Sequence, residues 1–252
     1  MQFAVVFLLL MVFALPCSAD CDTQVERIAD LLSRFTKHSE RAFADCKVWP
    51  ADPGKTIVAV AALQKLSSSG QLSTLDDGVY GLSVFVVSGS DGKILHRFVE
   101  DDALPSDSIS LSGIAIDTAR YRLATSVLAF GVRATQGNPR VEIIGLDLYV
   151  PSPDGLKRVL KGLRVVSRYS EQRTANCYRN DETERMIAIA RSTTRGYADL
   201  VLTEKHVITQ PVTVRKPPAG QCASTQTSST SRYLLRFDGK SYQIPQAMKD
   251  ER

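Results

Sequence analysis

Apolar residues recur at helical spacing near the start of the chain. Between Thr23 and Phe43 they fall mostly three or four positions apart, with charged residues between them. This pattern is typical of a helix that buries one face. Asp22 or Thr23 can cap its N-terminus, and Glu26 stands three residues after Thr23, as a capping box requires. The pattern predicts one amphipathic helix over about 23–43.

After Pro50 the helical period gives way to short β-branched runs separated by Gly, Asp, Ser and Pro. Such runs are typical of strands joined by tight turns. Strands are expected at 56–62, 80–88, 93–99, 109–116, 127–134, 141–150, 156–160, 163–167, 186–190, 198–203, 212–215, 232–237 and 240–244. The sequence predicts a mainly β fold, an antiparallel meander in the form of a sandwich or a propeller-like array, with an open barrel as an alternative.

Turn residues divide these runs. Asp91-Gly92, Asp154-Gly155 and Asp238-Gly239 each stand between two apolar runs, and Asp-Gly is favoured in two-residue type I′ turns. The third turn would place Leu235 opposite Tyr242 and give a hairpin with one buried face. The stretches 216–220 and 223–231 are rich in small and polar residues and are expected to be exposed loops around Cys222.

The first nineteen residues contain no Lys, Arg, Asp or Glu. Their apolar run ends at Pro16-Cys17-Ser18-Ala19, where small residues suit signal peptidase. We therefore expect a signal peptide over 1–19 and a single β-rich domain over 20–252, without a stable membrane span after cleavage. An uncleaved anchor is disfavoured because the run is short against the roughly 20 residues that a spanning helix needs. Acylation of Cys17 is disfavoured by the preceding proline.

Four cysteines remain after the leader: Cys21, Cys46, Cys177 and Cys222. An even number outside the cytoplasm predicts disulfides, and three pairings are possible. We expect Cys21 to pair with Cys46 and Cys177 with Cys222, because each pair encloses a segment with its own secondary structure. A straight helix over 23–43 would separate its ends by about 30 Å, so the first pairing requires the helix to break. No cysteine has the CxxC spacing or the nearby histidine of a metal site.

Charge excludes some partners. The formal net charge of +4 favours loose contact with an anionic component of the cell envelope, and another protein is the second class of partner expected. This charge is too small and too evenly spread for a nucleic-acid surface.

Motifs for nucleotide binding or hydrolysis are missing. Pro53-Gly54-Lys55-Thr56 ends like a P-loop, but Trp49 stands where its first glycine belongs and the next segment is strand-like. Neither Gly-x-Ser-x-Gly nor His-Glu-x-x-His occurs in the chain. No cofactor is expected. Trp49, beside Cys46, is expected to pack against the first disulfide.

The histidines and acidic residues are the remaining candidates for chemistry, and no spacing singles out any of them. We therefore assign no catalytic, cofactor-binding or metal-binding residue. The two acidic clusters are expected to be solvated loops, because apolar residues and Pro105 interrupt the geometry of a calcium loop. A glycosidase would need two carboxylates about 5 to 9 Å apart. The residues concerned are His38, His96, His206, Glu100, Asp101, Asp102, Asp107, Asp181, Glu182 and Glu184.

Four segments resemble those of a family of uncharacterised exported proteins of proteobacteria. They are Cys46-Lys47-Val48-Trp49-Pro50, Asp117-Thr118-Ala119-Arg120-Tyr121-Arg122-Leu123, Gly196-Tyr197-Ala198-Asp199-Leu200-Val201 and Arg236-Phe237-Asp238-Gly239-Lys240-Ser241-Tyr242. The resemblance implies export and no particular activity. The Gly-x-x-Asp-Leu part also resembles FG-GAP propeller repeats, without their Asp-rich calcium loop.

These observations favour a periplasmic or secreted protein that acts as a non-enzymatic binding or interaction module. The alternative is an exported hydrolase that acts on an envelope polymer and whose nucleophile and base meet only in the fold. A pocket with convergent titratable groups would distinguish the two.

Overall fold

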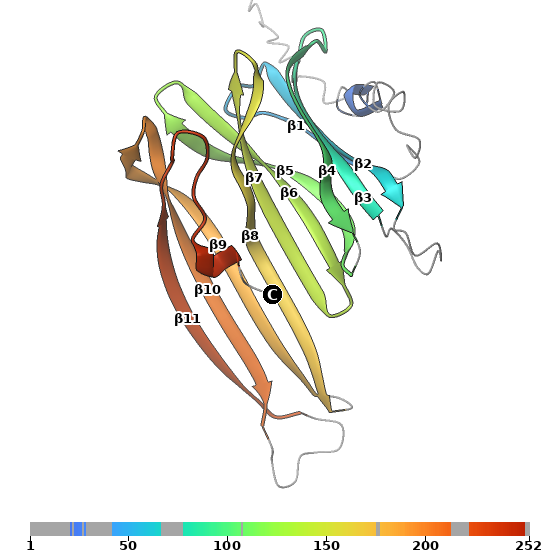
Figure 1. Cartoon of the computed structure of the whole chain (residues 1–252), viewed down its shortest axis with the longest axis vertical. Helices are drawn as coiled ribbons and strands as arrows, with labels where there is room; N and C mark the ends of the chain where they lie inside the picture. The colour runs from blue at the N-terminus through green and yellow to red at the C-terminus, as the bar shows by residue number, and fades with distance from the viewer. Residues whose placement is uncertain are drawn as a thin grey trace, which may run out of the picture.

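The computed structural model describes Cys21, residues 23–26, Ile28 and residues 42–66, 78–106, 108–174, 177–212 and 222–249. These residues form two antiparallel sheets, as Figure 1 shows. The leader over 1–19 lies outside the described residues. Among the described residues, no helix has the length and apolar character needed to cross a membrane.

Each sheet is a meander, because strands that follow one another in the chain are neighbours in the sheet. The smaller sheet has the order β1 (Ala42–Val48), β2 (Lys55–Leu66), β3 (Gly78–Ser88) and β4 (Ile94–Ser106). The larger sheet runs from β5 to β11: β5 (Ser110–Ala124), β6 (Val127–Asn138), β7 (Val141–Ser152), β8 (Gly155–Thr174), β9 (Cys177–Thr194), β10 (Tyr197–Pro211) and β11 (Ser224–Leu235). A short helix, α2 (Gln246–Lys249), follows. The predicted mainly β antiparallel meander is confirmed.

Strands in the middle of the larger sheet are buried on both faces. On β6, Phe130 belongs to the core shared with the smaller sheet, whereas its neighbour Ala129 belongs to a second core on the opposite face. On β7, Tyr149 and Leu148 divide between the two cores in the same way. Burial on both faces explains why these strands appear in the sequence as nearly continuous apolar runs.

The C-terminal segment after β11 covers the second core. Tyr242 donates its hydroxyl to the carbonyl of Ala198 at 2.6 Å, and its backbone N–H donates to the carbonyl of Val159 at 2.7 Å. Tyr242 and Met248 both belong to this core. We call the side of the larger sheet that carries this second core, opposite the smaller sheet, its inner face.

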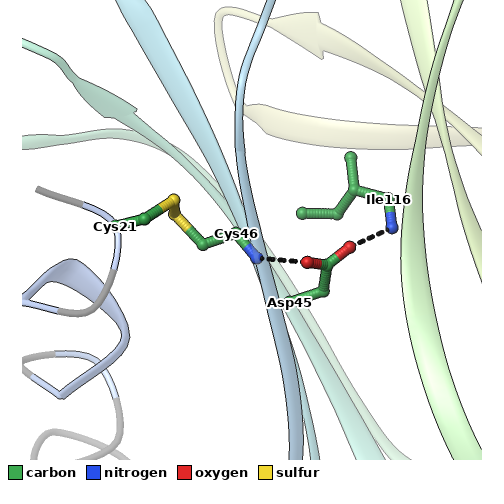
Figure 2. The surroundings of a disulfide bond; sticks show 4 residues. All are labelled: Cys21, Asp45, Cys46 and Ile116. Atoms are coloured by element: carbon green, nitrogen blue, oxygen red, sulfur yellow. Dashed lines mark hydrogen bonds between the residues drawn. A yellow bond between two sulfur atoms is a disulfide. The ribbon is translucent and has the colours of Figure 1, made fainter. Parts of the chain in front are cut away.

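The first disulfide holds helical residues against the outside of the smaller sheet. Cys21 and Cys46 are joined with their Cα atoms 5.6 Å apart, which confirms the predicted pairing. Figure 2 shows the bridge on one side of β1 and the carboxylate of Asp45 on the other, where it accepts the N–H of Ile116 at 2.6 Å. Asp45 thus ties β1 to the edge strand of the larger sheet.

The predicted helix over 23–43 is not confirmed. Helical residues are described only between Cys21 and Ile28, and residues 29–41 lie outside the described residues. Phe43, counted as the last apolar position of the helix, belongs to β1. Its ring lies 5.9 Å from that of Tyr80, so packing between strands explains its apolar character.

Trp49 packs differently from the prediction. It lies in the core between the two sheets, with its ring 5.4 Å from that of Phe130. Cys46 belongs to the cluster on the other side of the smaller sheet. The tryptophan therefore anchors the main core and does not pack against the disulfide.

Two of the three Asp-Gly pairs lie at hairpins that join the predicted strands, but neither forms the predicted type I′ turn, because Asp91 and Asp154 do not have a positive φ. Asp91-Gly92 lies between β3 and β4, and Asp154-Gly155 lies between β7 and β8. At the third, Phe237 pairs with Tyr242, so the predicted pairing of Leu235 with Tyr242 and the strand at 240–244 are wrong.

The side chain of Asp238 accounts for the wider third turn. Its Oδ1 accepts the N–H groups of Lys240 at 2.7 Å and Ser241 at 2.8 Å, which closes a four-residue loop. Gly239 has a φ of 104°, but Asp238 does not have a positive φ, whereas a type I′ turn needs both. Both central residues are positive instead at Arg195 (50°) and Gly196 (88°), between β9 and β10.

Candidate functional site

Strands β8 to β11 continue past the two cores as a single layer, which extends below the rest of the molecule in Figure 1. We call residues 167–174, 177–185, 204–211 and 222–231 the arm, and the other described residues the body. At the end of the arm, Cys177 and Cys222 are joined with their Cα atoms 5.6 Å apart, as predicted.

Strand register gathers polar side chains on the inner face of the arm. Ser167, Thr183 and His206 are paired across β8, β9 and β10, and paired residues share a face. In the next row toward the end of the arm, Tyr169 pairs with Asp181. This face continues the one that carries Leu202 in the body, because side chains two residues apart point the same way.

A pocket of about 410 Å³ opens among these side chains. This volume lies within the range of small-molecule sites. The pocket is lined by Ser167, Tyr169, Glu171, Arg179, Asp181, Thr183, Glu204 and His206, and we call it the arm pocket.

An ion pair separates the arm pocket from the apolar core. Arg185, whose side chain is only 1% exposed, lies with Nη2 2.7 Å from Glu204 Oε2. Its Nη1 donates to the carbonyl of Arg164 at 2.9 Å, and the hydroxyl of Tyr233 contacts Glu204 at 3.4 Å. A buried charge needs both an opposite charge and hydrogen bonds, and Arg185 has both.

A second set of charges lies across the pocket. His206 Nε2 is 2.7 Å from Asp181 Oδ1, and Arg179 Nη2 is 3.6 Å from Asp181 Oδ2. Each carboxylate oxygen of Asp181 therefore lies close to a cationic or hydrogen-bond-donating side chain. The sequence singled out neither His206 nor Arg179 as its partner.

Two polar atoms in the pocket have no partner among the described residues. Ser167 is 3% exposed, and its buried Oγ makes no hydrogen bond. Arg179 Nε is also buried without a partner. A buried polar group left unpaired costs about 1–3 kcal/mol, and such a group at a pocket is suited to hydrogen-bond a bound molecule.

The acidic cluster at 181–184 is part of strand β9 and not a solvated loop. Successive residues of a strand point to opposite faces. Asp181 lies at the arm pocket, whereas Glu182 and Glu184 face Arg168 on the other side, with Glu184 Oε1 3.0 Å from its Nη2. Asp181 and Glu182 therefore cannot act as the two carboxylates of one glycosidase site.

The cluster at 100–102 also lies in a strand, β4, so its prediction as a loop is wrong. Glu100 bridges the two sheets, with Oε1 2.9 Å from Arg158 Nη2 of β8. Hydrogen bonding to Arg158 lowers the pKa of Glu100 to about 2 against the opposing effect of burial. A proton donor needs a raised pKa, so Glu100 serves to join the sheets.

Those of the remaining candidates that the structure describes lie apart from the arm pocket, and His96, Glu100 and Asp101 line a separate pocket of about 620 Å³. Asp101 accepts the amide of Gln64 at 2.6 Å, and Asp102 pairs with Lys65 at 2.7 Å. His96 pairs with Val86 in the register of β4 with β3. His38 and Asp107 lie outside the described residues.

Asp117, the first residue of one family-like segment, organises a wide bulge of β5. It accepts hydrogen bonds from the N–H of Ala119 at 2.9 Å, the hydroxyl of Tyr121 at 3.0 Å and Arg133 Nη2 at 2.6 Å. Burial acts to raise the pKa of Asp117, but these hydrogen bonds and the Arg133 charge outweigh it and hold the pKa below its usual value. The segment therefore has a structural role here.

Within the part of the chain that the structure describes, His, Cys, Asp and Glu side chains do not gather in groups of three or more that could hold a metal ion.

Comparisons with protein-family models, with curated proteins and with solved structures find no match to this chain.

Proposed function

We propose that this chain is an exported binding protein without catalytic activity, and that its arm pocket holds a neutral sugar unit of an envelope or extracellular polymer. The observation that carries the proposal is the buried, unpaired hydroxyl of Ser167 in a pocket lined by hydrogen-bonding side chains. The leader and the two disulfides support export. The stacking of the smaller sheet on the larger one supports a sandwich-like form over a propeller.

The polar groups of the pocket suit a sugar. Hydroxyl groups of a sugar both donate and accept, and the pocket offers acceptors on Asp181, donors on Arg179 and hydroxyls on Ser167 and Thr183. Tyr169 adds an aromatic ring with a polar tip, which can contact an apolar sugar face and a hydroxyl together.

The charge of the pocket favours a neutral ligand over the anionic one expected from the net charge of the chain. Arg185 and Glu204 neutralise each other at 2.7 Å. Arg179 faces both Asp181 and Glu171, its register partner in β8. No excess of positive charge is left to attract an anionic polymer.

A glycan-binding experiment tests the proposal. Mature protein is applied to immobilised neutral and acidic oligosaccharides, and affinity for the best-binding neutral glycan is measured for variants. Ser167→Ala and Tyr169→Ala should each weaken binding roughly tenfold or more, the usual effect of removing an anchoring contact.

Matched controls lie on the opposite face of the same arm. Ser170 bonds Asn180 there at 2.8 Å, and Tyr178 is exposed. Ser170→Ala and Tyr178→Ala should leave the affinity unchanged. Binding only to acidic glycans, or equal losses in the control variants, would refute the neutral-sugar site.

A hydrolase is the second candidate, because the His206–Asp181 pair shares the pocket with a buried serine. In register, however, Thr183 separates Ser167 from His206. Strands about 4.8 Å apart put the two backbones roughly 10 Å apart, whereas a nucleophile and its base must approach to about 3 Å. Glycan turnover by the wild type that is lost in folded His206→Ala would establish the hydrolase instead.

A further inference from the structure

The larger sheet ends in an edge strand that no described residue covers. In the described residues β11 pairs only with β10, and its residues from Ser224 to Thr230 are all exposed. No described strand pairs with their outward N–H and C=O groups, so these groups can pair with an added strand. Such an edge is a ready template for strand addition.

The other three edges of the two sheets carry features that hinder pairing. β1 contains the charged residues Asp45 and Lys47, and Asp45 accepts the N–H of Ile116 on β5. β5 is also an edge strand, and its register with β6 shifts at three places. β4 has two register shifts and a proline, Pro105. Charges, bulges and proline are the usual protections of sheet edges.

β11 lacks all of these protections over eight residues. The segment Ser224–Ser231 has no charged residue and no proline, and its register with β10 continues without a bulge. Among the described edges only this one combines length, regularity and neutrality.

We propose that β11 pairs with the β11 of a second copy of this chain, independently of the arm pocket. A two-fold axis perpendicular to the sheet reverses the strand and keeps the faces continuous, as an isologous dimer requires. With the axis at Thr227, Ser224 lies opposite Thr230 of the second copy and Thr225 lies opposite its Ser229. Hydroxyl pairs of this kind stabilise antiparallel strands.

The nearest charge does not oppose this pairing. Arg232 is the first charged residue after the neutral segment, and it would lie opposite position 222 of the second copy and not opposite another Arg232. Ser224–Ser231 can therefore pair with its own copy without charge repulsion. A strand that evolved to bind a charged peptide would not need this property.

Light scattering on the mature protein from dilute to concentrated solution tests the dimer. Gln226→Lys with Ser228→Lys places like charges opposite each other across the axis, on the face away from the arm pocket, and should raise the dimer dissociation constant about tenfold or more. The double glutamate variant at the same positions should do the same. An equimolar mixture of the two should restore the dimer, because each lysine then faces a glutamate.

Restoration in the mixture cannot arise if either variant is misfolded, so the design separates pairing from folding. A wild type that is monomeric at every concentration would overturn the proposal. This holds even if the monomer binds an added extended peptide. A dimer that persists unchanged in the lysine variant would also overturn it, because its interface would lie elsewhere.

Discussion

The body and the arm use the same strands in opposite ways. In the body, β8 and β10 carry Leu163 and Leu200 in a closed apolar core. A few residues further along the same face, they carry Ser167 and His206 around an open pocket. One sheet thus changes from a buried scaffold to an exposed polar layer without a break in the chain.

This contrast shows how the two regions are stabilised. Burial of apolar side chains dominates in the body, where rings of Trp49, Phe130 and Tyr149 pack together. The arm has few buried apolar side chains and instead has ion pairs and the Cys177–Cys222 disulfide. Substitutions in the body should therefore affect unfolding, and substitutions in the arm pocket should affect binding.

The largest effect on stability is expected from Phe130→Ala in the body. Phe130 is fully buried and contacts two other rings, and truncation of such a residue costs about 3–5 kcal/mol. Urea denaturation of the mature protein measures it. Tyr178→Ala in the arm, where the residue is exposed, should change the free energy of unfolding by less than about 0.5 kcal/mol. Equal losses of unfolding free energy in Phe130→Ala and Tyr178→Ala would contradict the distinction between body and arm.

Removal of the arm disulfide should come next. Replacing both Cys177 and Cys222 by serine removes a bridge between residues that are 45 positions apart in the sequence. Loss of a native disulfide typically costs about 2–5 kcal/mol of stability. Hydrogen exchange should show faster exchange at 177–185 and 222–231, with body amides still protected. Uniform acceleration throughout both regions would show that the arm does not open independently.

A smaller loss is expected at the C-terminal turn. Gly239 has a φ of 104°, which a branched residue adopts only under strain, so Gly239→Val should cost about 1–3 kcal/mol. Chemical denaturation compares it with Lys240→Val, one residue further on. An unchanged midpoint for Gly239→Val would show that this turn can be rebuilt without cost.

The smallest effect should come from the ion pair between the sheets, because Glu100 is 26% exposed and water screens part of the interaction. Its pKa is lowered from 4.5 to about 2, so its contribution is present above about pH 4.5 and is lost as the pH falls toward 2. Glu100→Gln should therefore be less stable than the wild type at pH 7, with a difference that shrinks at pH 3. A difference that grows on acidification would contradict this assignment.

Much of the body could be predicted from the sequence, because its apolar runs and turns follow directly from burial. The disulfide pairs were also predicted. The arm was not: β11 from Ser224 to Ser231 and the first half of β9 are polar on both faces, and a strand without an apolar face has no alternating pattern to detect.

The site could not be predicted for a related reason. His206 and Asp181 are 25 residues apart in sequence, and only the register of β9 with β10 brings them together. The neighbouring carboxylates that the sequence does show, Asp181 and Glu182, are separated by the alternation of the strand. Likewise, the width of the turn at Asp238 depends on side-chain hydrogen bonds that the Asp-Gly pattern does not reveal.

The most direct test of binding by the arm is an amide NMR titration of the mature protein with the neutral oligosaccharide that binds best on the glycan panel. We predict that chemical shifts change first at Ser167, Thr183 and His206 and their neighbours in the arm, with body amides unaffected. Shifts that cluster in the body, or an arm that does not respond at saturating oligosaccharide, would refute binding by the arm.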